Sequence, residues 1–196
     1  NSKPSTVLYG SYSIEPIIES KFKDGKIHVV YAGTLDPRKG SILAVEAVQY
    51  LPSNFHVHII GFGRKKDKEN LLKVISDISA KSDATVSYDG LLDGNDYIEF
   101  LQKCDIGLST QIPNAEYNET SFPSKILSYL TNGLKVVSIK IKAIEISALR
   151  EMISFYSEAD PTKIAEAIVS ISKLENFDSR EQICKLDREF KINLRK

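Results

Sequence analysis

The 196-residue sequence predicts an α/β protein: a Rossmann-like three-layer domain in which helices cover both faces of a parallel sheet of about six strands. Two observations lead to this prediction. Short apolar runs alternate with segments of about 10–15 residues that have helical periodicity, as in right-handed βαβ units. Residues 27–33 (IHVVYAG) are almost all apolar and rich in β-branched side chains, which is typical of a strand buried on both faces.

The first part of the domain is predicted to contain three strands. They are expected at 27–33, 55–61 and 85–88, because each run is short and apolar and a glycine ends or closely follows it. The segments 41–51 and 68–80 between them carry apolar residues at helical spacing, and Pro52 ends the first helix.

The second part continues the same alternation. A short helix is predicted at 95–104 and a strand at 106–109. A polar stretch then leads to a helix at about 123–131, which Asn132-Gly133 ends. The last strands are expected at 135–139 and 153–156.

Both ends of the chain have separate patterns. An apolar run at 6–9 is followed by a polar linker up to residue 26. Asp160 before Pro161 predicts the N-cap of a helix. Ser179 with Gln182 predicts a capping box for a last helix. The narrow apolar stripe of that helix must pack either on this domain or on a domain outside this chain.

Composition limits the classes of function. Lys and Arg together number 26, as do Asp and Glu, so the chain lacks the basic field of a nucleic-acid-binding protein. No segment approaches the length of a membrane span or an apolar signal peptide. Cys104 and Cys184 have no metal-ligand spacing and are expected to be reduced thiols in a cytosolic domain. Because Met152 is the only methionine, we expect this chain to be a piece of a longer protein.

The loop 33–40 is the first candidate site, because doubly wound sheets bind ligands beyond the carboxyl ends of their strands. Gly33 would let the backbone approach a ligand, and the helix after Gly40 would offer its amides to an anion. Arg38 and Lys39 would add the cations that a diphosphate needs. The alternative is a plain turn with two solvated charges.

Gly61 and Gly63 follow the second strand as a Gly-x-Gly pair. The third glycine of a dinucleotide fingerprint is missing, and no acidic residue follows at the expected distance. The pattern therefore disfavours NAD, and a P-loop is absent as well.

The start of the helix near residue 123 is the second candidate site. Pro123 suits the first turn, and the amides of Ser124, Lys125 and Ile126 would point outward. Lys125 is a cation at the positive end of a helix dipole, a conflict that a bound anion would relieve. The alternative is that Lys125 extends into water.

The three histidines are expected to be structural or surface residues rather than catalysts. His56 and His58 share one face of a strand and His28 begins another, but two histidines on a face do not make a metal site.

Several motifs occur along the chain in a set order. They are Tyr31–Leu35 with Lys39-Gly40, Ile59–Gly63, Asp89-Gly90, Cys104–Ile106, and Ser121–Leu130 with Gly133 and Val136-Val137. Together they resemble the family 4-like glycosyltransferases over roughly residues 27–170.

The resemblance implies the C-terminal, nucleotide-sugar-binding half of a GT-B enzyme, whose two Rossmann-like domains face each other across a cleft. Residues 1–26 would form a hinge strand and linker, 27–175 the donor-binding domain, and 176–196 a helix that packs toward the missing N-terminal domain. The full-length enzyme would transfer a sugar with retention of configuration, with no cofactor or essential metal ion, in polysaccharide or glycoconjugate biosynthesis.

The resemblance also implies the partners. The donor would be a nucleotide sugar, most simply a UDP-sugar. A glycan, lipid-linked or protein acceptor would bind through the missing domain, so this fragment alone would be inactive. The location would be cytoplasmic, and the full-length protein could work at the inner face of the membrane.

The resemblance and the loop patterns together give the expected site residues. The diphosphate would contact Gly33, Thr34, Arg38, Lys39, Ser124, Lys125 and Ile126. The base and ribose would lie near Gly61, Gly63, Gly90, Leu91, Glu119 and Ser128. No catalytic residue is assigned.

Two positions depart from the family pattern. Thr34 stands where arginine is frequent, so Arg38 or Lys125 would have to replace that cation. Ser128 stands where a ribose-binding glutamate is usual, and Glu119 is one position away from the place of its partner glutamate. These departures leave open a non-catalytic GT-B module for binding or assembly. A relative of the nucleotide-sugar epimerases is a separate alternative.

Overall fold

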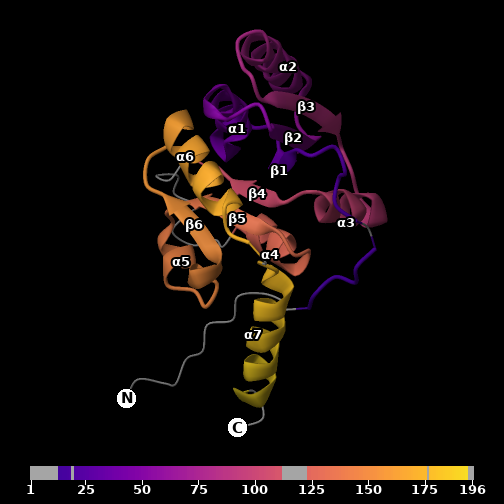
Figure 1. Cartoon of the computed structure of the whole chain (residues 1–196), viewed down its shortest axis with the longest axis vertical. Helices are drawn as coiled ribbons and strands as arrows, with labels where there is room; N and C mark the ends of the chain where they lie inside the picture. Colours follow the sequence, from indigo (N-terminus) through magenta and orange to yellow (C-terminus); the bar gives the residue numbers. More distant parts are fainter. Residues whose placement is uncertain (1–12, 19, 112–122, 176, 194–196) are drawn as a thin grey trace.

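The computed structural model describes residues 13–18, 20–111, 123–175 and 177–193, which form a six-stranded parallel sheet with helices on both faces (Figure 1). The strand order is β3-β2-β1-β4-β5-β6. This confirms the predicted fold class. The strands are β1 Ile27–Thr34, β2 Phe55–Phe62, β3 Thr85–Gly90, β4 Ile106–Ser109, β5 Lys135–Ile139 and β6 Ile153–Tyr156.

The helices form two layers because the chain reverses direction along the sheet. It first moves from β1 to β3 and then crosses to β4, and right-handed crossovers place these two sets of connections on opposite faces. After β6, α6 returns to pack beside α1. The α-helices are α1 Ser41–Glu46, α2 Lys65–Ser79, α3 Gly94–Lys103, α4 Ser124–Thr131, α5 Lys142–Glu145, α6 Pro161–Ser172 and α7 Ser179–Asn193. Short 3-10 turns are η1 Pro37–Lys39, η2 Ala47–Tyr50 and η4 Arg150–Met152.

The sheet is splayed between β1 and β4, where the strand order reverses. These strands pair over only two residues each, at Val29–Val30 and Ile106–Gly107. Beyond this point the buried Tyr129 hydroxyl of α4 accepts from the Ala32 amide at 2.8 Å and donates to the Leu108 carbonyl at 3.2 Å. One side chain thus satisfies backbone groups that the ladder leaves open.

Several predicted boundaries shift in the structure. The helix expected at 68–80 begins three residues earlier, at Lys65, and the helix expected at 41–51 ends in a 3-10 turn. The short helix α5 had no sequence signal. The Asp160 N-cap is confirmed, because its carboxylate accepts from the Thr162 and Lys163 amides. The apolar run 6–9 lies outside the described residues.

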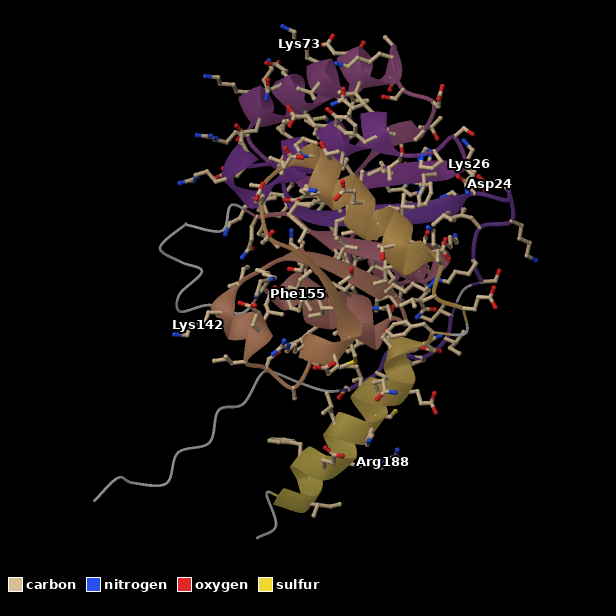
Figure 2. The ribbon with its side chains drawn as sticks, turned by 60° about the vertical axis from the view of Figure 1, so that its left-hand side comes forward. Asp24, Lys26, Lys73, Lys142, Phe155 and Arg188 are labelled. Carbon is tan, nitrogen blue, oxygen red and sulfur yellow. The ribbon has the colours of Figure 1, made fainter. Side chains whose placement is uncertain are left out.

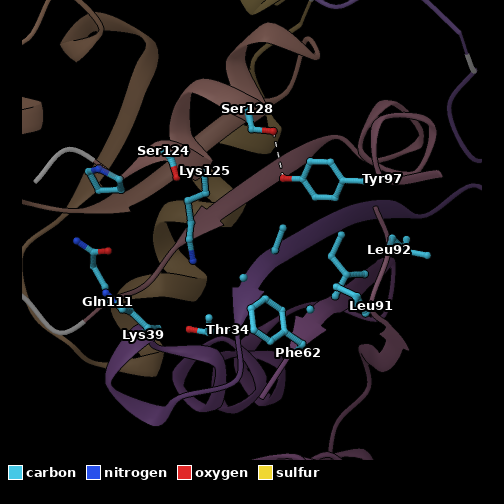
Figure 3. A pocket seen from close by; sticks show the side chains of 15 residues that line it. Thr34, Lys39, Phe62, Leu91, Leu92, Tyr97, Gln111, Ser124, Lys125 and Ser128 are labelled. Atoms are coloured by element: carbon cyan, nitrogen blue, oxygen red, sulfur yellow. Dashed lines mark hydrogen bonds between the residues drawn. The ribbon is translucent and has the colours of Figure 1, made fainter. Parts of the chain in front are cut away.

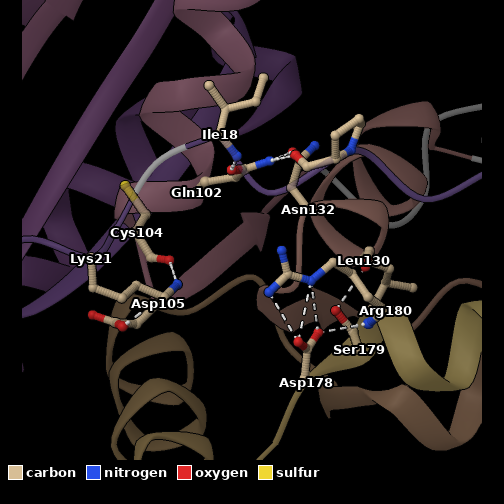
Figure 4. Close-up of polar contacts among 11 residues, drawn as sticks. Ile18, Lys21, Gln102, Cys104, Asp105, Leu130, Asn132, Asp178, Ser179 and Arg180 are labelled. Atoms are coloured by element: carbon tan, nitrogen blue, oxygen red, sulfur yellow. Dashed lines mark hydrogen bonds and ion pairs between the residues drawn. The ribbon is translucent and has the colours of Figure 1, made fainter.

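The predicted capping box of the last helix is wrong. The Ser179 hydroxyl instead donates to the Leu130 carbonyl of α4 at 2.8 Å, and the Asp178 carboxylate accepts from the Arg180 amide (Figure 4). Ser179 is used for a tertiary contact, so Asp178 satisfies the helix start.

The first turns of α7 therefore pack on this domain, with the Ile183 side chain fully buried. The rest of the helix, which carries Arg188, extends away from the body of the sheet (Figures 1 and 2).

The described part of the segment before β1 contains no helix or strand. The Gln102 amide of α3 holds it in place, because it accepts from the Ile18 amide and donates to the Pro16 carbonyl (Figure 4). Farther along, the Lys21 ammonium donates to the Cys104 carbonyl. In the part of the chain that the structure describes, no helix combines the length and apolar character needed to cross a membrane.

Candidate functional site

A cavity of about 560 Å³ opens at the carboxyl ends of β1 and β2, beside the point where β1 and β4 diverge (Figure 3). Open α/β sheets bind ligands at this topological switch point. The described residues that line it are Ala32, Gly33, Thr34, Lys39, Ile60, Gly61, Phe62, Leu91, Leu92, Tyr97, Gln111, Pro123, Ser124, Lys125 and Ser128.

Hydrogen bonds from neighbouring side chains hold the loop after β1 in its conformation. The buried Tyr31 hydroxyl lies 2.9 Å from the Thr34 carbonyl and 3.1 Å from the Lys39 carbonyl, so it clamps both ends of the turn. The Thr110 hydroxyl donates to the Gly40 carbonyl at 2.7 Å. A Cβ at Gly40 would come within 1.8 Å of the Thr110 carbonyl oxygen, so this position requires glycine. The result is that Lys39 is presented to the cavity.

Arg38 does not line the cavity, contrary to the expectation that it would hold a diphosphate. Its exposed guanidinium bonds both carboxylate oxygens of Asp36, at 2.6–3.1 Å. These hydrogen bonds lower the pKa of Asp36 to about 2. Arg38 thus stabilises the turn rather than the site.

Lys125 of α4 folds into the cavity instead of extending into water. Its Nζ lies 4.0 Å from the centre of the Tyr31 ring, a cation–π contact, and a Cβ built at Gly33 would lie 3.0 Å from it. No carboxylate among the described residues lies within ion-pair distance of it. Burial, together with the charge of Lys39, lowers the pKa of Lys125 to about 7.

Gly61 is required by a close approach between strands. A Cβ there would lie 1.7 Å from the Gly33 carbonyl oxygen, so no other residue fits without moving the backbone. The Tyr88 hydroxyl donates to the Gly61 carbonyl at 2.9 Å and fixes the same edge. Gly33 and Gly61 therefore form a flat floor for the cavity.

Besides Arg38, three more of the predicted site residues lie outside the cavity lining. Ile126 is fully buried in the core because it faces inward on α4, and its amide donates to the Pro123 carbonyl. A Cβ at Gly63 would meet Leu35 rather than open space, and Gly90 precedes the lining residue Leu91. The predicted residues that do line the cavity are Gly33, Thr34, Lys39, Gly61, Leu91, Ser124, Lys125 and Ser128. Glu119, with Ser121 and Phe122, lies outside the described residues.

The wall opposite the lysines was largely missed from the sequence. Tyr97 of α3 donates to or accepts from Ser128 of α4 at 3.1 Å, and the exposed side chains of Phe62 and Leu91 form an apolar mouth (Figure 3). Tyr97 is the first aromatic residue of the helix after β3, which places it near the ligand edge of the sheet. That position was the available signal.

The histidines form a cluster outside this cavity. His28 Nδ1 lies 2.9 Å from His58 Nε2, while their other ring nitrogens bond Asp24 and Asp89. Contacts with neighbouring side chains thus hold both rings in place, and neither ring lines the cavity. No group of three or more His, Cys, Asp or Glu among the described residues is arranged to hold a metal ion.

Comparison with known proteins gives one family. The family described as glycosyl transferases group 1 matches residues 26–173. No curated protein sequence matches the chain.

Solved structures resemble the chain at low sequence identity. HepE from Anabaena, solved with UDP and glucose, has a TM-score of 0.66 at 16% identity, over 87% of this chain and 48% of that chain. A UDP-forming α,α-trehalose-phosphate synthase from Burkholderia xenovorans has a TM-score of 0.65 at 12% identity, over 84% and 41%. The C-terminal domain of a group 1 family protein from Francisella tularensis has a TM-score of 0.62 at 17% identity, over 81% and 80%.

These similarities establish the fold of the chain. The chain spans about half the length of HepE and most of the isolated Francisella domain.

Proposed function

This chain belongs to the group 1 glycosyltransferases, and from that premise we propose that its cavity binds the nucleoside diphosphate of a sugar donor, most simply a UDP-sugar. The observation that carries the proposal is the convergence of Lys39, Lys125 and the first turn of α4 at one end of the cavity.

This end of the cavity suits a diphosphate. Two lysine side chains face it, and the charge of Lys39 adds to the cost of protonating Lys125. The Ser124 and Lys125 amides begin α4 and lack intrahelical acceptors, and the helix dipole adds positive potential there. A bound diphosphate would neutralise this charge and would be stabilised as the leaving group of sugar transfer. Lys125, rather than Arg38, would supply the cation that Thr34 lacks.

The rest of the cavity suits a nucleoside. Phe62 and Leu91 offer apolar surface for a base, and Ser128 offers a hydroxyl toward a ribose. UDP is the nucleotide in the HepE complex and the one formed by the Burkholderia synthase, which favours uridine among the bases.

We further propose that the full-length protein transfers the sugar with retention of configuration, in polysaccharide or glycoconjugate biosynthesis. The acceptor, whether glycan, lipid-linked or protein, would bind across the cleft in a domain outside this chain. The lysines and helix amides supply the positive charge that a metal ion would otherwise bring, so the proposal needs no metal ion or cofactor.

A non-catalytic binding module is the second candidate. Thr34 and Ser128 favour it, since neither carries the charge expected at its position. Absence of nucleotide binding to the intact two-domain protein would favour this module, and epimerisation without an acceptor would identify the third alternative.

The first experiment is calorimetric titration of the chain with UDP, GDP and ADP, with and without EDTA. We expect saturable binding of UDP, unchanged by EDTA and weakened at least about tenfold by Lys39→Ala, because a charge-assisted contact is lost. The matched control is Lys73→Ala, since Lys73 is exposed on α2 (Figure 2) and does not line the cavity. Equal binding by Lys39→Ala and the wild type would contradict the diphosphate assignment.

A further inference from the structure

Tyr97 and Ser128 bring two neutral hydroxyls together on the cavity wall. They come from different helices, α3 and α4, and their oxygens lie 3.1 Å apart (Figure 3). Both side chains are half-buried and both line the cavity. Burial raises the pKa of Tyr97, which keeps the phenol protonated near neutral pH.

The hydroxyls of Tyr97 and Ser128 have hydrogen-bonding capacity that their mutual bond does not use. Each hydroxyl carries one proton, and their mutual hydrogen bond consumes one of the two. Within the described ranges, neither oxygen has a second hydrogen-bond partner. One O–H donor and several lone pairs therefore remain for a ligand.

The backbone around Ser128 is held in place, so the pair is preorganised. The Ser128 carbonyl accepts from the Thr131 hydroxyl at 3.2 Å and from the Asn132 side-chain amide at 2.9 Å. An extra bond from outside the helix ladder restrains this turn, and less ordering is needed when a ligand binds.

The pair is also at a suitable distance from the cationic end. Ser128 lies one helical turn after Ser124, a rise of roughly 6 Å along α4. In a nucleoside diphosphate, the vicinal hydroxyls of the ribose lie a comparable distance from the phosphate attached to that ribose. A diphosphate at the start of α4 would thus bring its ribose to Tyr97 and Ser128.

We infer that Tyr97 and Ser128 together recognise the vicinal diol of the donor's ribose, through hydrogen bonds between neutral hydroxyls. This inference rests on the proposed nucleotide site and adds Tyr97 as a specificity-determining residue. In the described lining of the cavity no carboxylate is present to accept both ribose hydroxyls. The pair would do so by accepting from one hydroxyl and donating to the other.

The test is the preference of the chain for UDP over 2′-deoxy-UDP and over 3′-deoxy-UDP, measured by calorimetry, with inorganic pyrophosphate as a fourth ligand. We expect the wild type to prefer UDP over each deoxy analogue about three- to tenfold, the range of one neutral hydrogen bond. Tyr97→Phe, which removes only the hydroxyl, should bring one of these two ratios near one, because it weakens UDP but not the analogue that lacks the partner hydroxyl. Ser128→Ala should bring the other ratio near one, and pyrophosphate affinity should not change in either variant.

Tyr50→Phe is the matched control, because Tyr50 is an exposed tyrosine away from the cavity. A merely structural role for Tyr97 would weaken UDP and both deoxy analogues equally, which would overturn the inference. Equal binding of UDP and both deoxy analogues by the wild type would also overturn it, and would assign the hydroxyls to the sugar ring or to no ligand. In both cases the proposed function would stand if Lys39→Ala still weakened UDP, whereas absence of UDP binding to the wild type would overturn both.

Discussion

Lys125 is the site residue whose protonation we expect to depend most on a bound ligand. It begins a helix, lies over the Tyr31 ring and faces Lys39, so burial, the helix dipole and a like charge all disfavour its protonated form. Such a cation is costly in an empty cavity and favourable when an anion arrives. The positive charge of Lys125 thus lies where it would pair with a bound diphosphate.

Lys125 gives a pH-dependent binding prediction. Its pKa is lowered to about 7 in the free cavity, and a bound diphosphate would raise it. Above pH 7, Lys125 of the protein without UDP loses its proton. UDP binding then requires the uptake of one proton, so the affinity for UDP should fall as the pH rises. Between pH 7 and 9 we expect a roughly 10- to 50-fold loss, measured by calorimetry in buffers of different ionisation enthalpy.

Lys125→Arg is the matched control for this effect. Arginine stays protonated throughout this pH range, so the variant should bind UDP with little pH dependence and without proton uptake. The same slope in the variant and the wild type would show that another group titrates.

His56 gives a prediction about stability. Burial, reinforced by the nearby His58 and His28, lowers its pKa to about 4. Between pH 6.5 and 4 the unfolded chain therefore binds more protons than the folded one, and the free energy of unfolding falls as the pH falls. We expect His56 to contribute roughly 2 kcal/mol of this loss, allowing for solvent screening.

Urea unfolding of the wild type and His56→Gln at several pH values measures this contribution. The variant should lose less stability across the window, because its side chain does not titrate. Parallel curves for the two proteins would refute the assignment to His56.

At the scale of elements, strands were predicted better than their ends and connections. The strands at 106–109, 135–139 and 153–156 have the predicted bounds, because buried parallel strands require continuous apolar runs. The start of α2 was missed because Lys65–Asp67 carry no apolar periodicity, although Asp67 pairs with Arg64 at the helix start. Local pattern does not encode such contacts.

The candidate site was predictable only in part, for the same reason. Glycines and lysines at strand ends mark the ligand edge, so Gly33, Gly61 and Lys39 could be selected. Arg38 was misplaced because its pairing with Asp36 depends on the conformation of the turn. Tyr97 was missed because its partner, Ser128, is on another helix and 31 positions away in sequence.

The contact between α4 and the diverging strands gives a prediction at this scale. Tyr129→Phe would leave the buried Ala32 amide and Leu108 carbonyl without the hydroxyl, and should cost about 2–3 kcal/mol. Gly107→Ala should cost about 3 kcal/mol or more, because its Cβ would come within 2.3 Å of the Tyr129 ring.

Denaturant unfolding of both variants measures these changes. As a control, Tyr50→Phe should change stability by less than about 0.5 kcal/mol, since its hydroxyl is at an exposed position. If Tyr129→Phe were equally neutral, the bridging role of the hydroxyl would be wrong.

At the scale of the whole molecule, the chain holds a six-stranded sheet and the cavity that we propose to bind the donor, and it spans about half the length of HepE. Because the cavity lies at the edge of one Rossmann-like unit, it is open toward any second domain that would face it. The far end of α7 extends beyond the body of this domain (Figure 1). We therefore expect this chain by itself to bind the nucleotide without catalysing sugar transfer.

We expect the isolated chain to bind UDP yet to transfer no sugar from a UDP-sugar, since the acceptor would be held elsewhere. Assays of UDP release with the isolated chain and with the intact protein check this. Transfer to an acceptor by the isolated chain would contradict the division of labour between domains.

The most direct test of the central claim is a crystal structure of this chain with UDP. The account predicts the diphosphate at the start of α4, with phosphate oxygens within about 3 Å of the Nζ atoms of Lys39 and Lys125. The uracil should lie toward Phe62 and Leu91. UDP bound elsewhere, or bound here with its diphosphate away from both lysines, would contradict the account.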